Sequence, residues 1–363
     1  MQRRPNVGGI RTRDTSLVNS AAPVPDAPRG RQARPPAYHV EVGAGLEGDD
    51  LAWALELLER VYPGKFDRSV WEWKYAAHYL GPPRIAVARL DGRIVGLQPS
   101  IRHQIWWRGR REIAYQLTDA LTHPEHRRRG VFSALVEAFA AAAGEEGAAC
   151  VFTFPNRLSY PGFARLGTWS HPFSLPLLVR APLPGLGRRA LPSAGGLRTG
   201  AVESFDPAVD RLGEDRLRRF QAATLRDHRY LNWRYLQAPR RPYTCIGARD
   251  GNVWRAYAVG RISRWLGVRV GLIVDLLGDA EALEQVLPAM GKALLDQGAR
   301  ALGVLLLPGT PEWDLLRRLG YRTLPVWAAG KEFYFLLRVC GPPSAGPGGR
   351  TDWWLTWGNI DIA

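Results

Sequence analysis

The chain has 363 residues, of which 46% are hydrophobic, and a formal net charge of +15. This length and apolar content suffice for two ordinary domains, each with a core of its own. The positive charge is almost all arginine and is spread along the chain, without the clustered stripe of a nucleic-acid-binding surface, so no specific nucleic-acid partner is expected.

Three stretches of the chain lack the pattern of a folded element. Residues 1–37 carry seven arginines and several prolines but no apolar core, and we predict a disordered extension there. Residues 181–200 and 341–350 are rich in Pro, Gly and Ala and are typical of linkers. Two blocks of similar length remain, 38–180 and 201–340, followed by a short aromatic C-terminal segment. We interpret each block as one domain.

The first block alternates between helical and strand patterns. Apolar spacing predicts helices over 51–61 and 71–79, and strands over 84–90, 93–107 and 111–122. A long helix over 131–146, a buried strand over 149–154 and a short helix over 159–166 follow. This order predicts an α/β (α+β) fold with a mixed sheet and helices on both faces.

The second block repeats the first in the same order. WEWKY (71–75) matches LNWRY (231–235), and YQLTDAL (115–121) matches LIVDLLG (272–278), which pairs Asp119 with Asp275. VFTFPNRLSYPGFARLGT (151–168) matches VLLLPGTPEWDLLRRLGY (304–321). We therefore interpret the chain as a duplicated fold. Only the first copy has the basic stretch HPEHRRRGVF (123–132).

This basic stretch connects a predicted strand to the long predicted helix. The first N–H groups of a helix have no internal partner, and the helix dipole favours negative charge there. Gly130 allows close approach of the backbone to a phosphate, and Arg127, Arg128 and Arg129 add positive charge. The turn is predicted to bind a diphosphate. The alternative is a solvated basic turn.

The stretch LTHPEHRRRGVFSAL (121–135) resembles the acyl-CoA-binding motif of the GNAT acyltransferase superfamily, in which R/Q-x-x-G-x-G/A precedes a long helix. Phe132 stands where the motif has Gly or Ala, and it either narrows the loop or packs on the helix. FPNRLSYPGFARLGT (154–168) resembles the closing motif of the family, with Phe163 where tyrosine is usual. The resemblance implies two tandem GNAT-like domains, each a mixed, mostly antiparallel sheet flanked by helices, of which the second is degenerate.

The resemblance also implies a reaction, in which an acyl group passes from acetyl-CoA or another acyl-CoA to a primary amine by direct attack. A backbone N–H around residues 121–123 would polarise the thioester carbonyl. The residues that the resemblance places at the cofactor are Leu121, Thr122, His123, Arg127, Arg128, Arg129, Gly130, Val131, Phe132 and Asn156.

Three side chains are candidates for proton transfer. Asp119 precedes the cofactor loop and could accept the amine proton, although its recurrence as Asp275 in the second block favours a structural role. His123 suits the same step near neutral pH, or caps the turn. Tyr160 could protonate the leaving thiolate in place of the usual tyrosine, or is a buried aromatic residue.

Two other functions stay open: an acyl-CoA-binding module without turnover, and a Fem-like transferase that uses aminoacyl-tRNA. The acceptor is a small molecule, sugar or peptide amine that the sequence does not identify.

Cys150, Cys245 and Cys340 form no C-x-x-C pair, so neither disulfides nor a metal cofactor is expected. Without an apolar run of the ~20 residues that span a bilayer, no membrane partner is expected and a cytoplasmic location is predicted.

Overall fold

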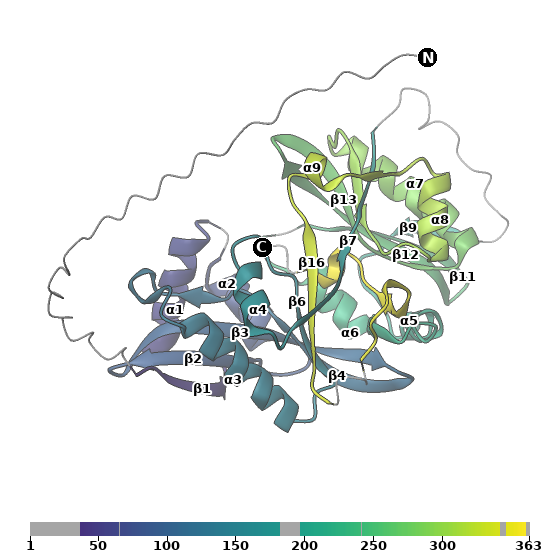
Figure 1. Cartoon of the computed structure of the whole chain (residues 1–363). Coiled ribbons are helices and arrows are strands. Elements are labelled where there is room, and N and C mark those ends of the chain that lie inside the picture. The colour runs from purple at the N-terminus through teal and green to yellow at the C-terminus, as the bar shows by residue number, and fades with distance from the viewer. Residues whose placement is uncertain (1–36, 65, 182–196, 241, 342–345, 361–363) are drawn as a thin grey trace, which may run out of the picture. The chain divides into compact units, whose positions relative to one another are not determined.

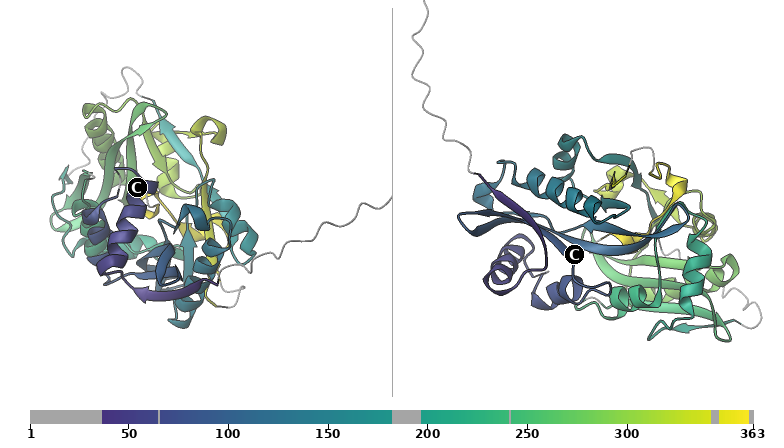
Figure 2. Two further views of the ribbon diagram at one scale, coloured as in Figure 1. Left: turned by 90° about the vertical axis from the view of Figure 1, so that its left-hand side faces the viewer. Right: turned by 90° about the horizontal axis from the view of Figure 1, so that it is seen from below.

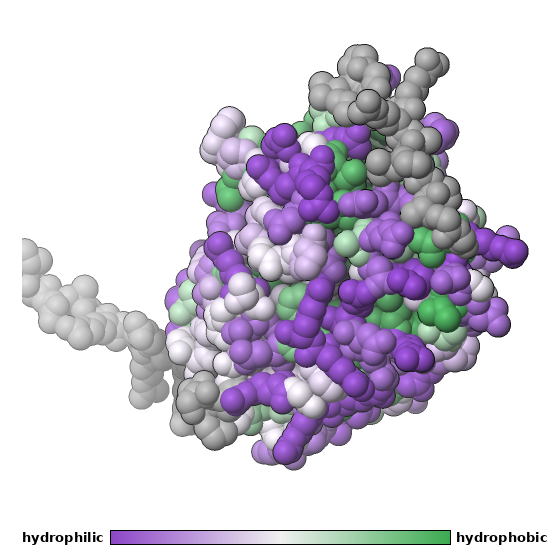
Figure 3. Space-filling model, turned by 90° about the vertical axis from the view of Figure 1, so that its right-hand side faces the viewer, coloured by the Kyte–Doolittle hydropathy of each residue, from purple (hydrophilic) through white to green (hydrophobic). Residues whose placement is uncertain are grey.

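The computed structural model describes residues 37–64, 66–181, 197–240, 242–341 and 346–360. The predicted extension 1–37, most of the predicted linker 181–200 and part of 341–350 lie outside these residues. The described residues form one compact unit, and none of their helices has the length and apolar content needed to cross a membrane. On the face drawn in Figure 3, hydrophilic side chains predominate and hydrophobic ones appear in scattered groups.

The first sheet follows the strand order β1-β2-β3-β4-β6-β16-β7 (Figure 1). Neighbours along this order are antiparallel except β4 and β6, which run parallel, so the predicted mixed, mostly antiparallel sheet is confirmed. The strands are β1 (His39–Ala44), β2 (Arg84–Leu90), β3 (Arg93–Trp107), β4 (Arg110–Leu117), β5 (Leu121–Thr122), β6 (Cys150–Thr153), β7 (Ser170–Leu175), β10 (Ala222–Thr224), β16 (Phe333–Val339) and β17 (Trp353–Trp354).

Helices cover both faces of this sheet (Figure 2). Side chains alternate along β2, so Ile85 and Val87 join one core while Ala86 and Ala88 join the other. The first core includes the buried face of α1, and the second includes that of α3. The helices of this part are α1 (Gly48–Val61), α2 (Arg68–Trp71), α3 (Val131–Glu145) and α4 (Tyr160–Leu166).

The second sheet has the order β15-β8-β14-β13-β12-β11-β9, with a parallel pair between β13 and β14. It too is mixed and flanked by helices, as the fold class predicts. Its strands are β8 (Leu177–Arg180), β9 (Arg198–Ala201), β11 (Thr244–Asp250), β12 (Val253–Trp265), β13 (Val268–Gly278), β14 (Leu302–Leu305) and β15 (Arg322–Leu324). The helices are α5 (Val209–Leu217), α6 (His228–Leu231), α7 (Ala280–Asp296), α8 (Pro311–Arg318) and α9 (Val326–Ala329).

The two sheets exchange strands. β8 leaves the first block and pairs with β14 and β15 in the second sheet, whereas β16 leaves the second block and lies between β6 and β7 in the first (Figure 1). β10 also pairs with β3 of the first sheet. Each sheet therefore contains strands from both blocks, 38–180 and 201–340.

The two copies meet at a pair of tryptophans that the repeat predicts to be equivalent. Trp73 and Trp233 stack with ring centroids 5.3 Å apart. The Nε1–H of Trp73 donates to the Trp233 carbonyl at 2.7 Å, and the Nε1–H of Trp233 donates to the Trp73 carbonyl at 2.9 Å. Each tryptophan lies in a π-helical turn, residues 72–76 and 232–236. The sequence predicts one continuous helix over 71–79. The structure instead has the short α-helix α2, followed by the wider π-helical turn over 72–76.

Two other differences from the predicted elements are local. The strand predicted over 111–122 is interrupted at Asp119, which takes a φ of 46°, and resumes as β5. The C-terminal aromatic segment supplies β17 and a 3-10 turn over 357–359. Most other predicted boundaries agree within one or two residues, such as α3 at 131–145 against 131–146.

Two buried histidines predict that acid destabilises the fold. Burial lowers the pKa of His78 and of His103 to about 3, from 6.5. The unfolded chain then binds more protons than the folded one below that ordinary value. Stability is therefore full at higher pH and falls as the pH drops toward 3. Urea titrations should show a loss of about 2 kcal/mol between about pH 6.5 and 5.5, which His78→Gln should roughly halve; a flat profile would contradict this.

Candidate active site

The site begins where two parallel strands of the first sheet separate. β4 and β6 pair as far as Leu117 and Thr153. Beyond that point Asp119 takes its left-handed conformation, and the chain continues as β5, which pairs with β3. A cavity of about 570 Å³ opens in the resulting splay.

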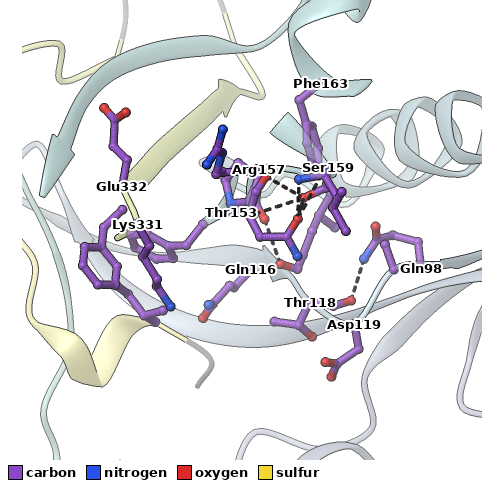
Figure 4. A pocket seen from close by; sticks show the side chains of 18 of the residues that line it. Gln98, Gln116, Thr118, Asp119, Thr153, Arg157, Ser159, Phe163, Lys331 and Glu332 are labelled. Atoms are coloured by element: carbon purple, nitrogen blue, oxygen red, sulfur yellow. Dashed lines mark hydrogen bonds between the residues drawn. The ribbon is translucent and has the colours of Figure 1, made fainter. Parts of the chain in front are cut away.

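Both halves of the chain line this cavity, which we call the splay cavity. Figure 4 shows Thr118 and Asp119 at one end and Lys331 and Glu332 at the other, with Gln116 between them. Lys331 and Glu332 come from the segment just before β16, so the strand exchange brings them here. The sequence did not predict them as site residues, because nothing local marks where β16 pairs.

The basic turn leaves backbone N–H groups exposed at the start of α3, where the sequence predicts a diphosphate site. Arg128 and Gly130 both take left-handed conformations, with φ of 60° and 84°, and Gly130 is the N-cap of α3. No side chain caps this helix end, so its first N–H groups remain available to a ligand. Arg127, Arg128 and Arg129 are exposed around it. These donors fit the diphosphate of a CoA thioester.

Gly130 is required for its conformation rather than for space. A Cβ built there would meet nothing within 4 Å, but a φ of 84° is strained for any residue with a side chain. The adjoining Val131 is buried in the core under α3, so only its backbone can face a ligand.

Phe132 packs on α4. Its ring meets that of Phe163 edge-on with centroids 5.1 Å apart, and a Cβ on Gly162 would lie 2.7 Å from it. The sequence left open whether Phe132 narrows the loop or packs on a helix, and in the structure it packs on α4. Because Phe163 also lines the splay cavity, this contact connects the first turn of α3 to the cavity wall.

The backbone of the strand before the turn is largely hydrogen-bonded within the sheet. Leu121 and Thr122 pair with β3, and the N–H of His123 donates to the Val95 carbonyl at 2.9 Å. In this conformation the His123 amide therefore cannot polarise a thioester, because its N–H already donates to the Val95 carbonyl. The Arg127 side chain folds back onto the Thr122 carbonyl at 3.3 Å, which ties the turn to the strand.

Asp119 is buried in an ion pair at the edge of the cavity. Its Oδ2 accepts from the Lys74 ammonium and, at 2.6 Å, from the Tyr75 hydroxyl. The side chains of Lys74 and Asp119 are only 2% and 5% exposed. These contacts tie the break after β4 to the π-helical turn that carries Lys74 and Tyr75.

Asp275, the counterpart of Asp119, makes the same kind of contacts. It accepts from the Tyr235 hydroxyl at 2.7 Å and from Arg226 Nε at 2.8 Å. Tyr75 and Tyr235 occupy matching positions of the repeat, so each half binds its aspartate with a tyrosine and a cation. This recurrence favours the structural interpretation of Asp119.

In the second half, the C-terminal segment occupies the corresponding splay. The Thr356 hydroxyl donates to Asp275 Oδ1 at 3.0 Å, and the Tyr230 hydroxyl donates to the Gly358 carbonyl at 3.2 Å. A Cβ on Gly358 would lie 2.3 Å from the Tyr235 hydroxyl, so the segment packs tightly there. This half therefore lacks the basic turn in its sequence and has a filled splay in its structure.

Tyr160 does not line the splay cavity. Its hydroxyl lies 3.1 Å from Nδ1 of His171, and its ring stacks on Tyr334 of β16 at 4.3 Å. This conformation does not support the prediction that Tyr160 protonates the thiolate, because its ring stacks on β16 outside the splay cavity. Phe163, where the family usually has tyrosine, is the aromatic residue of α4 that reaches the cavity.

His123 and Asn156 have local roles. Asn156 lines the cavity, but its Oδ1 accepts from the backbone N–H of Leu158 and Ser159 at 2.9 and 3.0 Å, which shapes the start of α4. His123 is half-buried and, with Glu125 and His126, could offer three ligand atoms within 4.8 Å of one another. The three arginines that follow favour an anion over a metal cation at this position.

Comparisons with known proteins identify similar domains and folds. Residues 45–171 match the model of the acetyltransferase (GNAT) domain family. A GCN5-related N-acetyltransferase from Anabaena variabilis superposes with a TM-score of 0.64 at 12% identity, over 84% of this chain and 73% of that one. A probable N-acyltransferase from Enterococcus faecalis gives 0.61 at 13%, over 84% and 73%.

The fold is also similar to that of an N-myristoyltransferase. The Saccharomyces cerevisiae enzyme, solved with bound myristoyl-CoA, has a TM-score of 0.52 at 10% identity, over 83% of this chain and 79% of that one. A search of the curated proteins finds no match. The likeness to solved structures shows the fold, and the family match covers the splay and the basic turn. Residues 45–171 thus form a GNAT acetyltransferase domain, and the fold of the chain is similar to that of solved N-acetyltransferases.

Proposed function

We propose that the chain is an acyl-CoA-dependent N-acyltransferase that moves an acyl group, acetyl in the simplest case, from CoA to a primary amine. The observation that supports this most directly is the uncapped N-terminus of α3, with its arginines, beside the splay cavity. The contact between Phe132 and Phe163 joins the two. A diphosphate bound at the turn would leave the thioester arm to enter the splay.

The proposed reaction is direct. The amine nitrogen forms a bond to the acyl carbon, the carbon–sulfur bond breaks, and the thiolate leaves with CoA. The ammonium formed at the amine must lose a proton. Because Asp119 is bound by Lys74 and Tyr75, we assign it a structural role at the break after β4. We assign removal of the amine proton to water in the cavity.

The site is proposed to work once per chain. The basic turn belongs to the first half alone, and residues 353–360 lie against the splay of the second. Calorimetric titration with CoA should therefore give a stoichiometry of one. Two equivalent sites per chain would contradict the proposal that the second half is degenerate.

A second candidate is an acyl-CoA-binding module without turnover. It is favoured by Phe163, which lines the cavity where the family usually has tyrosine, and by Tyr160, which is bound to His171. Purified protein should be incubated with a panel of acyl-CoAs and an amine library, and thiol release measured. Turnover supports the transferase, tight CoA binding without turnover supports the module, and retention of tRNA without CoA binding supports a Fem-like transferase.

A further inference from the structure

Exposed apolar side chains gather at one end of the second sheet. Leu266 and Val268 belong to the hairpin between β12 and β13, and Val326 and Trp327 belong to α9. They make up four of the six large hydrophobic residues that are exposed in the described chain, with Trp327 85% and Leu266 76% exposed. We call these four residues the apolar tip.

The hairpin and α9, which carry the apolar tip, lie against each other. The Nε1–H of Trp265, on the hairpin, donates to the Ala329 carbonyl at the end of α9, at 3.0 Å. A Cβ on Gly330 would lie 3.6 Å from Cδ2 of Leu266. Figure 1 shows α9 at the end of the second sheet where β13 is labelled. The hairpin and the helix therefore present their apolar side chains together.

The residue at the turn of the hairpin is unusual for its conformation. Leu266 takes a φ of 48° and Gly267 a φ of 81°, the left-handed pair that two-residue hairpins need. The corresponding turn of the first half, between β3 and β4, has Arg108 and Gly109, with φ of 49° and 86°. Asp and Asn tolerate this conformation, whereas a leucine there is strained and exposed. The turn gains nothing from an apolar side chain at this position, and the leucine stays exposed to solvent.

The surroundings of the tip are positively charged. Arg264 and Arg269 face each other across the hairpin, and Lys331 follows α9 in the chain. The Arg269 guanidinium also donates to the Gln297 carbonyl at 2.7 Å. An apolar surface with a basic rim complements an anionic lipid bilayer, in which tryptophan and leucine enter the interface and arginines bind headgroups.

We propose that the apolar tip docks the protein peripherally on anionic lipid membranes. A second copy of the chain fits the tip less well, because a two-fold contact would bring each basic rim against its own copy. Lys331 links the tip to the splay cavity: its ammonium lies 5.5 Å from the Trp265 ring centroid, and the residue lines the cavity. Docking would therefore hold one end of the cavity near the lipid surface.

The test is cosedimentation of the full chain with vesicles of phosphatidylcholine alone and of phosphatidylcholine with phosphatidylglycerol. The protein should sediment with the anionic vesicles, and high salt should weaken this binding. The variant Leu266→Asn/Trp327→Ser should bind about tenfold more weakly or worse, because it removes the two most exposed apolar side chains of the tip. Its melting temperature should not fall, since Asn suits the turn.

The matched control is Val253→Ser, which replaces a 58% exposed valine outside the tip, at the start of β12. This variant should bind anionic vesicles as the wild type does. Equal binding of the double variant and the wild type would overturn the proposal, as would no binding to anionic vesicles at low salt. A double variant that changes only the oligomeric state would instead assign the tip to a second copy. No outcome depends on acyl transfer.

Discussion

The variant Gly130→Asp should lose CoA affinity by about 100-fold or more while the chain stays folded. The substitution puts a carboxylate at the N-terminus of α3, where the diphosphate is proposed to bind, and it strains a residue held at a φ of 84°. The strain of the left-handed conformation costs about 1–2 kcal/mol. No steric clash adds to it, because a Cβ there meets nothing within 4 Å. Calorimetric titration with CoA measures the loss.

The matched control lies at the other end of the same helix. Gly147 also takes a left-handed conformation, with a φ of 76°, and its Cβ would also meet nothing within 4 Å. Gly147→Asp thus repeats the strain and the charge away from the proposed site, and should leave CoA affinity unchanged. Arg127→Ala should reduce CoA affinity by about 5- to 30-fold, less than Gly130→Asp does, since a partly solvated contact to phosphate contributes ~1–2 kcal/mol. If folded Gly130→Asp bound CoA like the wild type, the turn would hold another ligand.

The largest effect on stability is expected at Asp275. This residue and Arg226 are fully buried, and Asp275→Asn would leave the guanidinium without its counter-charge. Removing one partner of a buried ion pair costs about 3–5 kcal/mol, because the remaining charge is not solvated. The Thr356 hydroxyl also donates to Asp275, so the C-terminal segment should loosen as well. Urea unfolding followed by circular dichroism measures the change.

The control for Asp275 is the same substitution in an exposed pair. Asp296 pairs with Lys292 on the surface of α7, with side chains 62% and 74% exposed. Asp296→Asn should change the free energy of unfolding by less than about 1 kcal/mol, because solvent screens exposed ion pairs. Equal losses in the two variants would mean that burial of the Arg226 pair does not decide the stability of this half.

Local elements were predictable because they depend on neighbouring residues. Periodic apolar residues and Gly147 give the extent of α3, and Gly167 ends α4 in the left-handed conformation. The repeat predicted equivalence of the two halves, and the reciprocal hydrogen bonds of Trp73 and Trp233 agree with it. The uncapped start of α3 at Gly130 was also predictable, since the residues of this turn are consecutive in the chain.

The other parts of the site depend on contacts between distant segments. Periodicity shows which face of a strand is buried, but not which strand lies beside it. The position of β16 between β6 and β7 therefore could not be predicted, and with it Glu332 in the cavity and the ring that stacks on Tyr160. The Lys74 partner of Asp119 was hidden for the same reason, although the match of WEWKY to LNWRY marked its segment.

The exchange of β16 into the first sheet has a consequence for synthesis on the ribosome. Ribosomes add about 5–20 residues per second, so β6 waits on the order of 10–40 s before the strand that covers its free edge has been made. During that time an apolar strand edge is open to other chains, which is a condition for aggregation. Yield of folded protein should therefore depend on chaperones that shield nascent chains, and the first half made alone should be prone to aggregate.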